Sequence, residues 1–199
     1  MNPAKLQSLT TDFFEALYQK DPDPWQFATS EYEAQKYDTT IATLPRDRYQ
    51  SGFEIGGSIG ILTEQLARRC QKLLSVDVST IAQSQAITRC AHLDNIDFQL
   101  MSVPQQFPST DFDLIVLSEV GYYWCWEDLR TAQDLMLDRL QSSGHLLIVH
   151  WIADARILPL TGDEVHEAFI ELTTTQPHRL KHLNSLTNPQ YRLDLFEKI

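Results

Sequence analysis

Short apolar runs alternate with amphipathic segments along most of the chain, and this alternation predicts the fold. Apolar residues at helical spacing predict two helices before residue 49, at 3–19 and 30–44, separated by a proline-rich segment at 21–25. The apolar runs that follow predict strands at 51–55, 72–78, 96–101, 112–118 and 144–151. The stretches between them predict helices at 59–70, 79–92 and 126–141. Such an order is typical of a parallel sheet covered by helices on both faces.

The last third of the chain predicts an addition to that sheet. Thr161 and Glu164 have the spacing of a capping box, which starts a helix that runs to about residue 173. Two strands follow, at 178–185 and 190–197, and a turn-forming cluster joins them. So short a connection favours an antiparallel hairpin at the edge of the sheet.

Length and composition fit one α/β domain. The chain has 199 residues, of which 43% are hydrophobic and 22% charged, as in an ordinary globular protein. We expect a helical cap at 1–48 and a core at 49–199, built on a mostly parallel seven-stranded sheet with a C-terminal antiparallel hairpin.

The formal net charge of −11 limits the kinds of partner that the protein can bind. So acidic a surface repels phosphate backbones and anionic lipids, which argues against nucleic acid and membranes as partners. It is compatible with a small cationic or neutral acceptor. The sequence makes no prediction of oligomeric state.

The three cysteines are scattered, and His145, His150 and His166 lack a metal-ligand spacing with carboxylates. We therefore expect no disulfide framework and no metal. The N-terminus has no basic region followed by an apolar run, and no apolar stretch is long enough to span a bilayer, so we expect a cytoplasmic protein.

The segment from Glu54 to Gly60 (EIGGSIG) ends a predicted strand and opens a predicted helix. Its small residues allow a tight turn and a close approach of the backbone to a ligand, and the helix N-terminus favours a carboxylate. A plain strand-to-helix turn would look similar, and the loop lacks the G-x-G-x-x-G pattern of dinucleotide-binding proteins.

Two acidic residues favour a particular ligand. Asp77 ends the next strand, where a carboxylate accepts hydrogen bonds from a ribose, although it also fits a cap for the helix that starts at Ser79. Glu54, directly before the glycines, would repel a pyrophosphate and attract an ammonium and a sulfonium. The charges therefore favour S-adenosylmethionine over NAD.

These residues resemble class I S-adenosylmethionine-dependent methyltransferases, and the resemblance extends through 76–79 and 112–120. A narrower set resembles the nodulation protein S (NodS)-like methyltransferases: Asp23-Pro24-Trp25, Tyr32-Glu33-x-x-Lys36-Tyr37, Ser118-Glu119 with Tyr122-Tyr123, His150-Trp151, and the run from Leu160 to His166. The best-known members of that family N-methylate an amino sugar in a deacetylated chitin oligosaccharide. The resemblance implies a Rossmann-like fold, S-adenosylmethionine as cofactor, and N-methylation of an amino sugar or other small amine.

The chain departs from the family pattern at three places. Ser58 replaces the middle glycine of the first motif, and Met101-Ser102-Val103 stands where an acidic residue near the adenine is common. Gly121 stands where a larger apolar residue is usual. We therefore expect backbone groups at Ser102 and Val103 to recognise adenine, and an acceptor pocket of altered shape.

The resemblance implies the site residues. The expected cofactor contacts are Tyr32, Lys36, Tyr37, Glu54, Gly56, Gly57, Ser58, Gly60, Asp77, Val78, Ser102, Val103, Ser118 and Glu119. The expected acceptor contacts are Tyr122, Tyr123, Trp151 and Asp163.

Glu119, His150 and His166 are the candidate catalytic residues, because an amine acceptor must lose a proton and histidine titrates near neutral pH. Two of these residues have a structural alternative. His150 also fits a satisfied buried histidine, and Glu119 a structural ion pair. Among the expected acceptor contacts, Asp163 could instead stabilise the N-terminus of its helix, and Tyr122 and Tyr123 could be packing residues under a lid.

Two other functions stay open at this point. One is an O-methyltransferase of a small metabolite, which differs mainly in the nucleophile. The other is a non-catalytic S-adenosylmethionine-binding module, which the departures at Ser58 and after the third strand allow.

Overall fold

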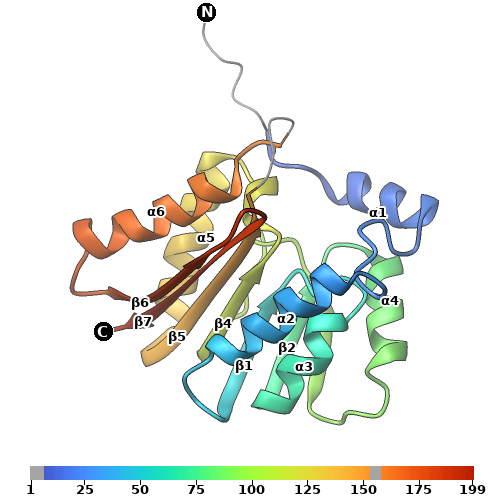
Figure 1. Cartoon of the computed structure of the whole chain (residues 1–199), viewed down its shortest axis with the longest axis horizontal. Helices are drawn as coiled ribbons and strands as arrows, with labels where there is room; N and C mark the ends of the chain where they lie inside the picture. The colour runs from blue at the N-terminus through green and yellow to red at the C-terminus, as the bar shows by residue number, and fades with distance from the viewer. Residues whose placement is uncertain (1–6, 153–157) are drawn as a thin grey trace, which may run out of the picture.

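The structure is a computed structural model that describes residues 7–152 and 158–199 (Figure 1). One seven-stranded sheet runs in the order β3-β2-β1-β4-β5-β7-β6. The strands are β1 (Tyr49–Ile55), β2 (Cys70–Asp77), β3 (Ile96–Leu100), β4 (Phe112–Ser118), β5 (Leu140–Trp151), β6 (Leu180–Thr187) and β7 (Tyr191–Lys198). Neighbours among β1 to β5 are parallel, and β7 is antiparallel to both β5 and β6. The predicted fold class is confirmed.

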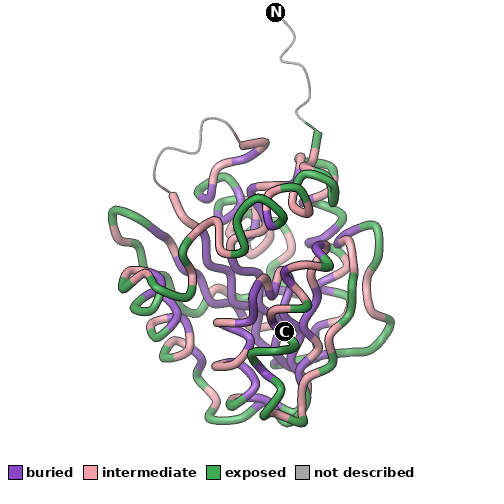
Figure 2. The backbone as a smooth tube through the Cα atoms, turned by 90° about the vertical axis from the view of Figure 1, so that its right-hand side faces the viewer, coloured by how far each residue is buried: buried purple, intermediate pink, exposed green. Residues whose placement is uncertain are grey.

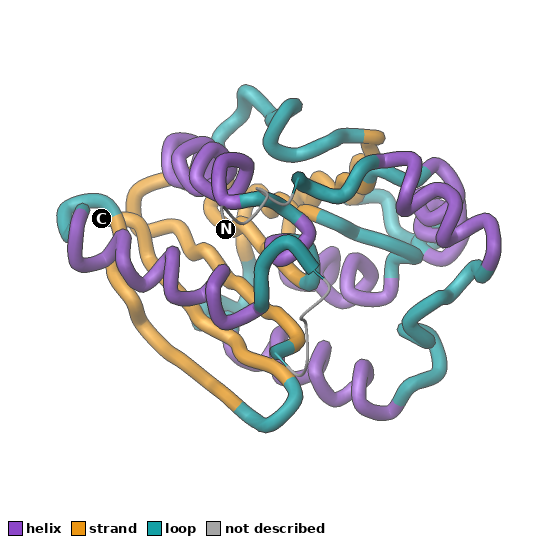
Figure 3. Tube along the Cα trace, turned by 90° about the horizontal axis from the view of Figure 1, so that it is seen from above, coloured by secondary structure: helices purple, strands orange, loops and turns teal. Residues whose placement is uncertain are grey.

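Helices cover both faces of this sheet (Figures 1 and 3). They are α1 (Thr11–Lys20), α2 (Glu31–Thr43), α3 (Ile61–Arg69), α4 (Thr80–Arg89), α5 (Trp126–Arg139) and α6 (Gly162–Thr175), with a 3₁₀ turn η1 (Gly121–Tyr123). Every residue of β4 is buried, and successive side chains enter opposite cores. Ile115 and Leu117 pack in the core that contains residues of α5 and α6, whereas Leu114 and Val116 pack in the core that contains residues of α2 and α3.

The burial pattern follows the layers (Figure 2). Central strands are buried on both faces because helices cover them, which explains their continuous apolar runs. The strand order reverses at β1, which lies between β2 and β4, so the carboxyl ends of these strands flank the crevice where open α/β sheets bind ligands.

The largest differences from the predicted boundaries are at the starts of α1 and β5. Helix α1 starts at Thr11 instead of residue 3, because the Thr10 side chain caps it and the Leu9 amide is bound to the carbonyl of Tyr123. Strand β5 starts at Leu140, directly after α5, instead of at residue 144, and it ends at Trp151 as predicted, so His150 lies inside it. The part of the predicted first helix at 3–6 lies outside the described residues.

The C-terminal predictions are confirmed. Thr161 and Glu164 form the expected capping box, and the two last strands pair as an antiparallel hairpin with β6 at the sheet edge. Among the described helices, none has both the length and the apolar character needed to cross a bilayer.

Candidate active site

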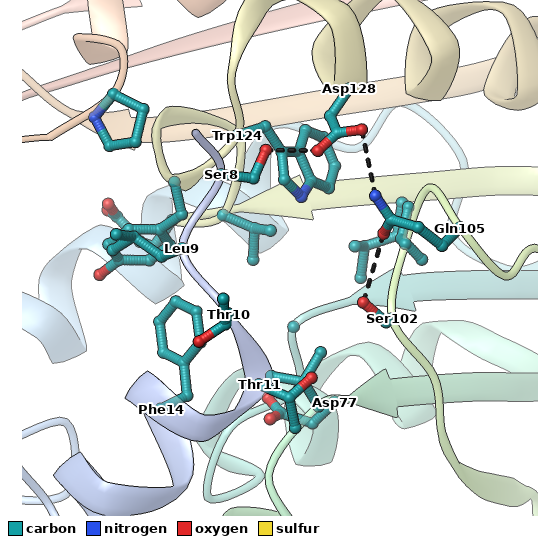
Figure 4. Close-up of a pocket in the computed structure, with 18 of the residues that line it drawn as sticks. Ser8, Leu9, Thr10, Thr11, Phe14, Asp77, Ser102, Gln105, Trp124 and Asp128 are labelled. Atoms are coloured by element: carbon teal, nitrogen blue, oxygen red, sulfur yellow. Dashed lines mark hydrogen bonds between the residues drawn. The ribbon is translucent and has the colours of Figure 1, made fainter. Parts of the chain in front are cut away.

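A cavity of about 1360 Å³ opens at the carboxyl ends of β1, β2, β3 and β4. The N-terminal segment 7–11 and the first turn of α1 lie along one side, and the start of α5 lies opposite (Figure 4). Trp25 and Phe27, which follow α1, also line it. The sheet, the cap and α5 therefore enclose a single space large enough for a cofactor and an acceptor together.

Most of the predicted cofactor residues meet at this cavity. Its lining includes Gly56, Ser58, Asp77, Val78, Ser102, Val103, Ser118 and Glu119. A second, small hollow shares several of these residues and adds Tyr37, Glu54 and Gly57. Tyr32, Lys36 and Gly60 line neither space.

Gly56, Ser58 and Gly60 of the glycine loop all have positive φ angles, which glycine adopts readily and serine rarely does. Gly56 has φ 81°, and a Cβ there would lie 2.2 Å from Val120 Cγ2. Ser58, which replaces the middle glycine, has φ 49°. Its amide donates to Asp77 at 2.8 Å and its hydroxyl pairs with that of Tyr18. These contacts hold a serine where the family commonly has glycine.

Asp77 combines the two roles that the sequence left open. Its carboxylate accepts the backbone amides of Ser58 and Ser79, each at 2.8 Å, and it also lines the cavity. Burial raises the pKa of Asp77, and the backbone hydrogen bonds oppose that rise. Each carboxylate oxygen retains a further lone pair, so both can also accept a ligand hydroxyl.

Glu54 lies beneath the glycine loop and is 1% exposed. The hydroxyls of Thr63 and Ser75 both donate to its Oε2 atom, at 2.6 and 2.7 Å. Those two bonds do not engage Oε1. Burial raises the pKa of Glu54 to about 7 despite the two hydrogen bonds, so the group changes charge in the neutral range.

Glu119 lines the cavity as one member of a buried charge cluster. Its Oε1 pairs with Lys36 Nζ at 2.5 Å, and its Oε2 accepts the Tyr122 hydroxyl at 2.6 Å and the Trp151 amide at 2.9 Å. Lys36 Nζ also lies 2.8 Å from a carboxylate oxygen of Glu33. The structure thus contains the ion pair that the sequence left as an alternative.

Lys36 is 1% exposed and does not reach the cavity, contrary to its expected contact with the cofactor. Burial lowers the pKa of Lys36, but Glu119 and Glu33 outweigh it, so the net shift is upward and the amine stays charged. Tyr32 stacks edge-on with Tyr191, and its ring lies 5.2 Å from Lys36 Nζ. The two residues stabilise the cap and do not line the site.

His150 and His166 are 0% exposed, and neither belongs to the described lining of the cavity. The Gly121 amide donates to His150 Nε2 at 3.0 Å, and His150 Nδ1 lies 3.1 Å from His166 Nε2. The geometry therefore does not present either ring to an acceptor. Gly121 lies against His150 and Val165 and does not belong to the described lining of the cavity, so an altered shape of the acceptor pocket stays a prediction.

Of the four expected acceptor residues, one belongs to the described lining of the cavity. Tyr123 lines the cavity, whereas Tyr122 is buried beneath it with its hydroxyl on Glu119. Trp151 contributes only its backbone amide to Glu119. Asp163 is exposed on the first turn of α6, 3.4 Å from Arg192, and lies away from the cavity, contrary to expectation.

Sequence reasoning missed the wall formed by α5. Asp128, Thr131 and Asp134 line the cavity and are three residues apart on α5. Their spacing in the sequence already places them on one face of the predicted helix. Asp128 accepts the Ser8 hydroxyl and, at 3.1 Å, the Gln105 amide, and the Ser102 hydroxyl donates to Gln105 at 3.3 Å (Figure 4). These bonds join the N-terminal segment, α5 and the loop after β3 around the cavity.

Comparisons with known proteins identify the family of this chain. The family model "Nodulation protein S (NodS)" matches residues 11–158. Nodulation protein S of Sinorhizobium fredii NGR234 is 29% identical over 88% of this chain and 83% of its own length.

The solved structures that are similar to the chain include two methyltransferases. The N-methyltransferase NodS from Bradyrhizobium japonicum WM9, in complex with S-adenosyl-L-homocysteine, is 25% identical with a TM-score of 0.82, over 94% of this chain and 97% of that one. A putative methyltransferase from Pseudomonas syringae is 34% identical with a TM-score of 0.73, over 85% of this chain and 100% of that one.

Proposed function

The chain belongs to the nodulation protein S family and is an S-adenosylmethionine-dependent methyltransferase, and we propose that its acceptor is the nitrogen of an amino sugar or another small amine. The S-adenosylhomocysteine bound in the Bradyrhizobium relative supports the cofactor.

The residues at the carboxyl ends of the strands fit this cofactor. When bound, S-adenosylmethionine supplies an electrophilic methyl group on a sulfonium. Asp77 has lone pairs for the ribose hydroxyls, and backbone groups at Ser102 and Val103 lie in the wall where the adenine is expected. Gly56 and Ser58 form the adjoining wall, and Glu54 behind them attracts an ammonium when it is charged.

The observation that supports an amine acceptor is the chemistry of the remaining cavity wall. It combines aromatic rings with carboxylates: Phe14, Trp25, Tyr123, Trp124 and Trp126 with Glu119, Glu127, Asp128 and Asp134. Among the described lining residues, Arg130 is the one basic side chain. Aromatic faces and carboxylates both attract ammonium groups, so this wall concentrates amines beside the cofactor.

The protein's part in the reaction is mainly alignment and exclusion of water. Glu119, an anion in the cavity wall, orients an amine by accepting its N–H, because its Oε1 has Lys36 as its protein partner and a second lone pair. The proposal assigns no proton transfer to His150 or His166, since Gly121 and Asp194 already occupy the outer ends of that pair.

An acceptor screen tests the proposal. Purified protein is incubated with S-adenosylmethionine and a panel of amines, deacetylated oligosaccharides and matched alcohols, and S-adenosylhomocysteine release is followed. We expect release with amines and a new methyl group on nitrogen by mass spectrometry. Methylation of oxygen, or release only with acceptors that lack an amine, would refute it.

A further inference from the structure

The turn η1 joins parts of the chain that lie far apart in sequence. The carbonyl of Tyr122 accepts the amide of Leu160 at 3.1 Å, and the carbonyl of Tyr123 accepts the amide of Leu9 at 2.9 Å. Tyr123 itself lines the cavity. A shift of this turn therefore moves the cavity wall and the segments that border it together.

Three buried side chains from β5, α6 and β7 hold the amide of this turn. Gly121 N–H donates to His150 Nε2 at 3.0 Å. His150 Nδ1 lies 3.1 Å from His166 Nε2, and His166 Nδ1 lies 2.6 Å from an oxygen of Asp194. All three side chains are 0% exposed. We refer to His150, His166 and Asp194 as the buried triad.

The donor at one end, the Gly121 amide, and the acceptor at the other, the Asp194 carboxylate, determine where every proton of the buried triad lies. A backbone amide can only donate, so His150 Nε2 carries no proton and Nδ1 carries it. That N–H must donate to His166 Nε2, and His166 in turn donates from Nδ1 to Asp194. Burial lowers the pKa of both imidazoles, consistent with two neutral rings.

Gly121 is required for this arrangement. A Cβ at this position would lie 2.9 Å from His150 Nε2 and 2.8 Å from Val165 Cγ1. Both distances are too short for real side-chain contacts, so the imidazole can approach the amide only at a glycine.

Asp194 is the fixed end of the triad. Besides His166, it accepts His182 Nε2 at 2.7 Å and Arg192 Nε at 2.8 Å. Burial alone would raise the pKa of Asp194. The hydrogen bonds and the neighbouring positive charges have the larger effect, and the net result is a pKa lowered to about 2. The carboxylate is therefore an anion held by three donors, which fixes the orientation of His166.

We propose that Asp194 is a positioning residue for methyl transfer, which acts through His166 and His150 to hold the Gly121 amide and so fixes the cavity wall at Tyr123. The triad orients the turn and transfers no proton. This inference rests on the proposed function for its effect on turnover, whereas its effect on the turn can be measured without any acceptor.

The test compares Asp194→Asn with Glu167→Gln. Glu167 is exposed and bonds to the same Arg192 at 2.7 Å, outside the buried triad, so it is a matched control. For Asp194→Asn we expect amide exchange at Gly121 to accelerate about tenfold and kcat for the best amine to fall about tenfold, with the affinity for S-adenosylhomocysteine within about twofold. Glu167→Gln should leave all three unchanged.

A double-mutant cycle with Gly121→Ala tests whether both residues act through one unit. If they do, the double variant loses much less kcat than the product of the two single losses. Independent multiplication of the losses would contradict the proposal.

Three results would overturn the inference. One is ¹⁵N NMR of the wild type that places a proton on His150 Nε2. The others are wild-type kcat in Asp194→Asn, or a loss of kcat that only follows its unfolded fraction. If Asp194→Asn does not fold, the ¹⁵N NMR spectra of the wild-type imidazoles and the kcat of Gly121→Ala test the inference instead. Failure of the wild type to bind S-adenosylhomocysteine would instead count against the proposed function.

Discussion

Glu119 illustrates how single residues are held at this site. Its φ of 57° lies in the left-handed region, which costs a non-glycine residue on the order of 1 kcal/mol. Bonds to Lys36, the Tyr122 hydroxyl and the Trp151 amide offset that cost. One side chain thereby ties α2, η1 and β5 together at the cavity wall.

Asp77 and Asp113 offer a matched pair of carboxylates at opposite ends of the sheet. Each accepts two backbone amides, but Asp113 binds those of Gln50 and Ser51 and does not line the cavity. We expect Asp77→Asn to weaken S-adenosylhomocysteine binding at least about tenfold, because hydrogen bonds to a charged group are lost. Asp113→Asn should lower stability and leave that affinity unchanged. Calorimetry and thermal unfolding measure both; equal loss of affinity would contradict this assignment.

The raised pKa of Glu54 predicts two effects of pH. Between its ordinary value of 4.5 and about 7, the folded protein keeps a proton that the unfolded chain has lost. The contribution of Glu54 to the free energy of unfolding therefore falls as pH rises through this window and is constant above it.

Ligand affinity should show the opposite trend. Only the charged form of Glu54 attracts an ammonium, so the affinity for S-adenosylhomocysteine should drop roughly tenfold from pH 8 to pH 6. Calorimetry across this range measures it. Glu54→Gln should remove that component while the ligand's own titration remains; the same pH dependence in both proteins would refute the assignment.

At the scale of elements, α6 shows how local capping supports a buried network. The capping box at Thr161 starts the helix that presents Val165 and His166 to β5 and η1. The helix itself does not line the cavity. Its contribution to the site is therefore indirect, through the buried triad.

Removal of the α6 cap should cost stability. Thr161→Ala loses the hydroxyl that accepts the Glu164 amide, and we expect the free energy of unfolding to fall by about 1 kcal/mol. Thr88→Ala is the control, because that exposed hydroxyl only bonds back to the Ser84 carbonyl within α4 and favours no helix start. Urea unfolding compares them; equal losses would argue against a capping effect.

At the scale of the whole molecule, the net charge of −11 and the acidic cavity wall act in the same direction. Both raise the local concentration of cations and lower that of anions, and salt screens both. The charge thus favours amine acceptors before any specific contact forms.

This charge effect predicts a dependence on ionic strength. The KM of a cationic amine should rise several-fold between about 10 and 300 mM salt, where the Debye length shortens from about 30 Å to below 8 Å. A neutral acceptor of similar size should show little change. Steady-state kinetics at several salt concentrations measure this, and an equal response of both acceptors would exclude steering by charge.

Local patterns in the sequence determined the elements, the parallel sheet with its terminal hairpin, and the glycine loop with Asp77, because periodicity, capping residues and turn residues act over a few positions. They could not determine the partners of Lys36 and Glu119, which lie 83 residues apart, or the chain from Gly121 to Asp194. A buried charge or imidazole must find a partner, but only tertiary packing decides which one. For the same reason Lys36, His150 and His166, which were expected to line the site, are buried beside it and bond to other protein groups.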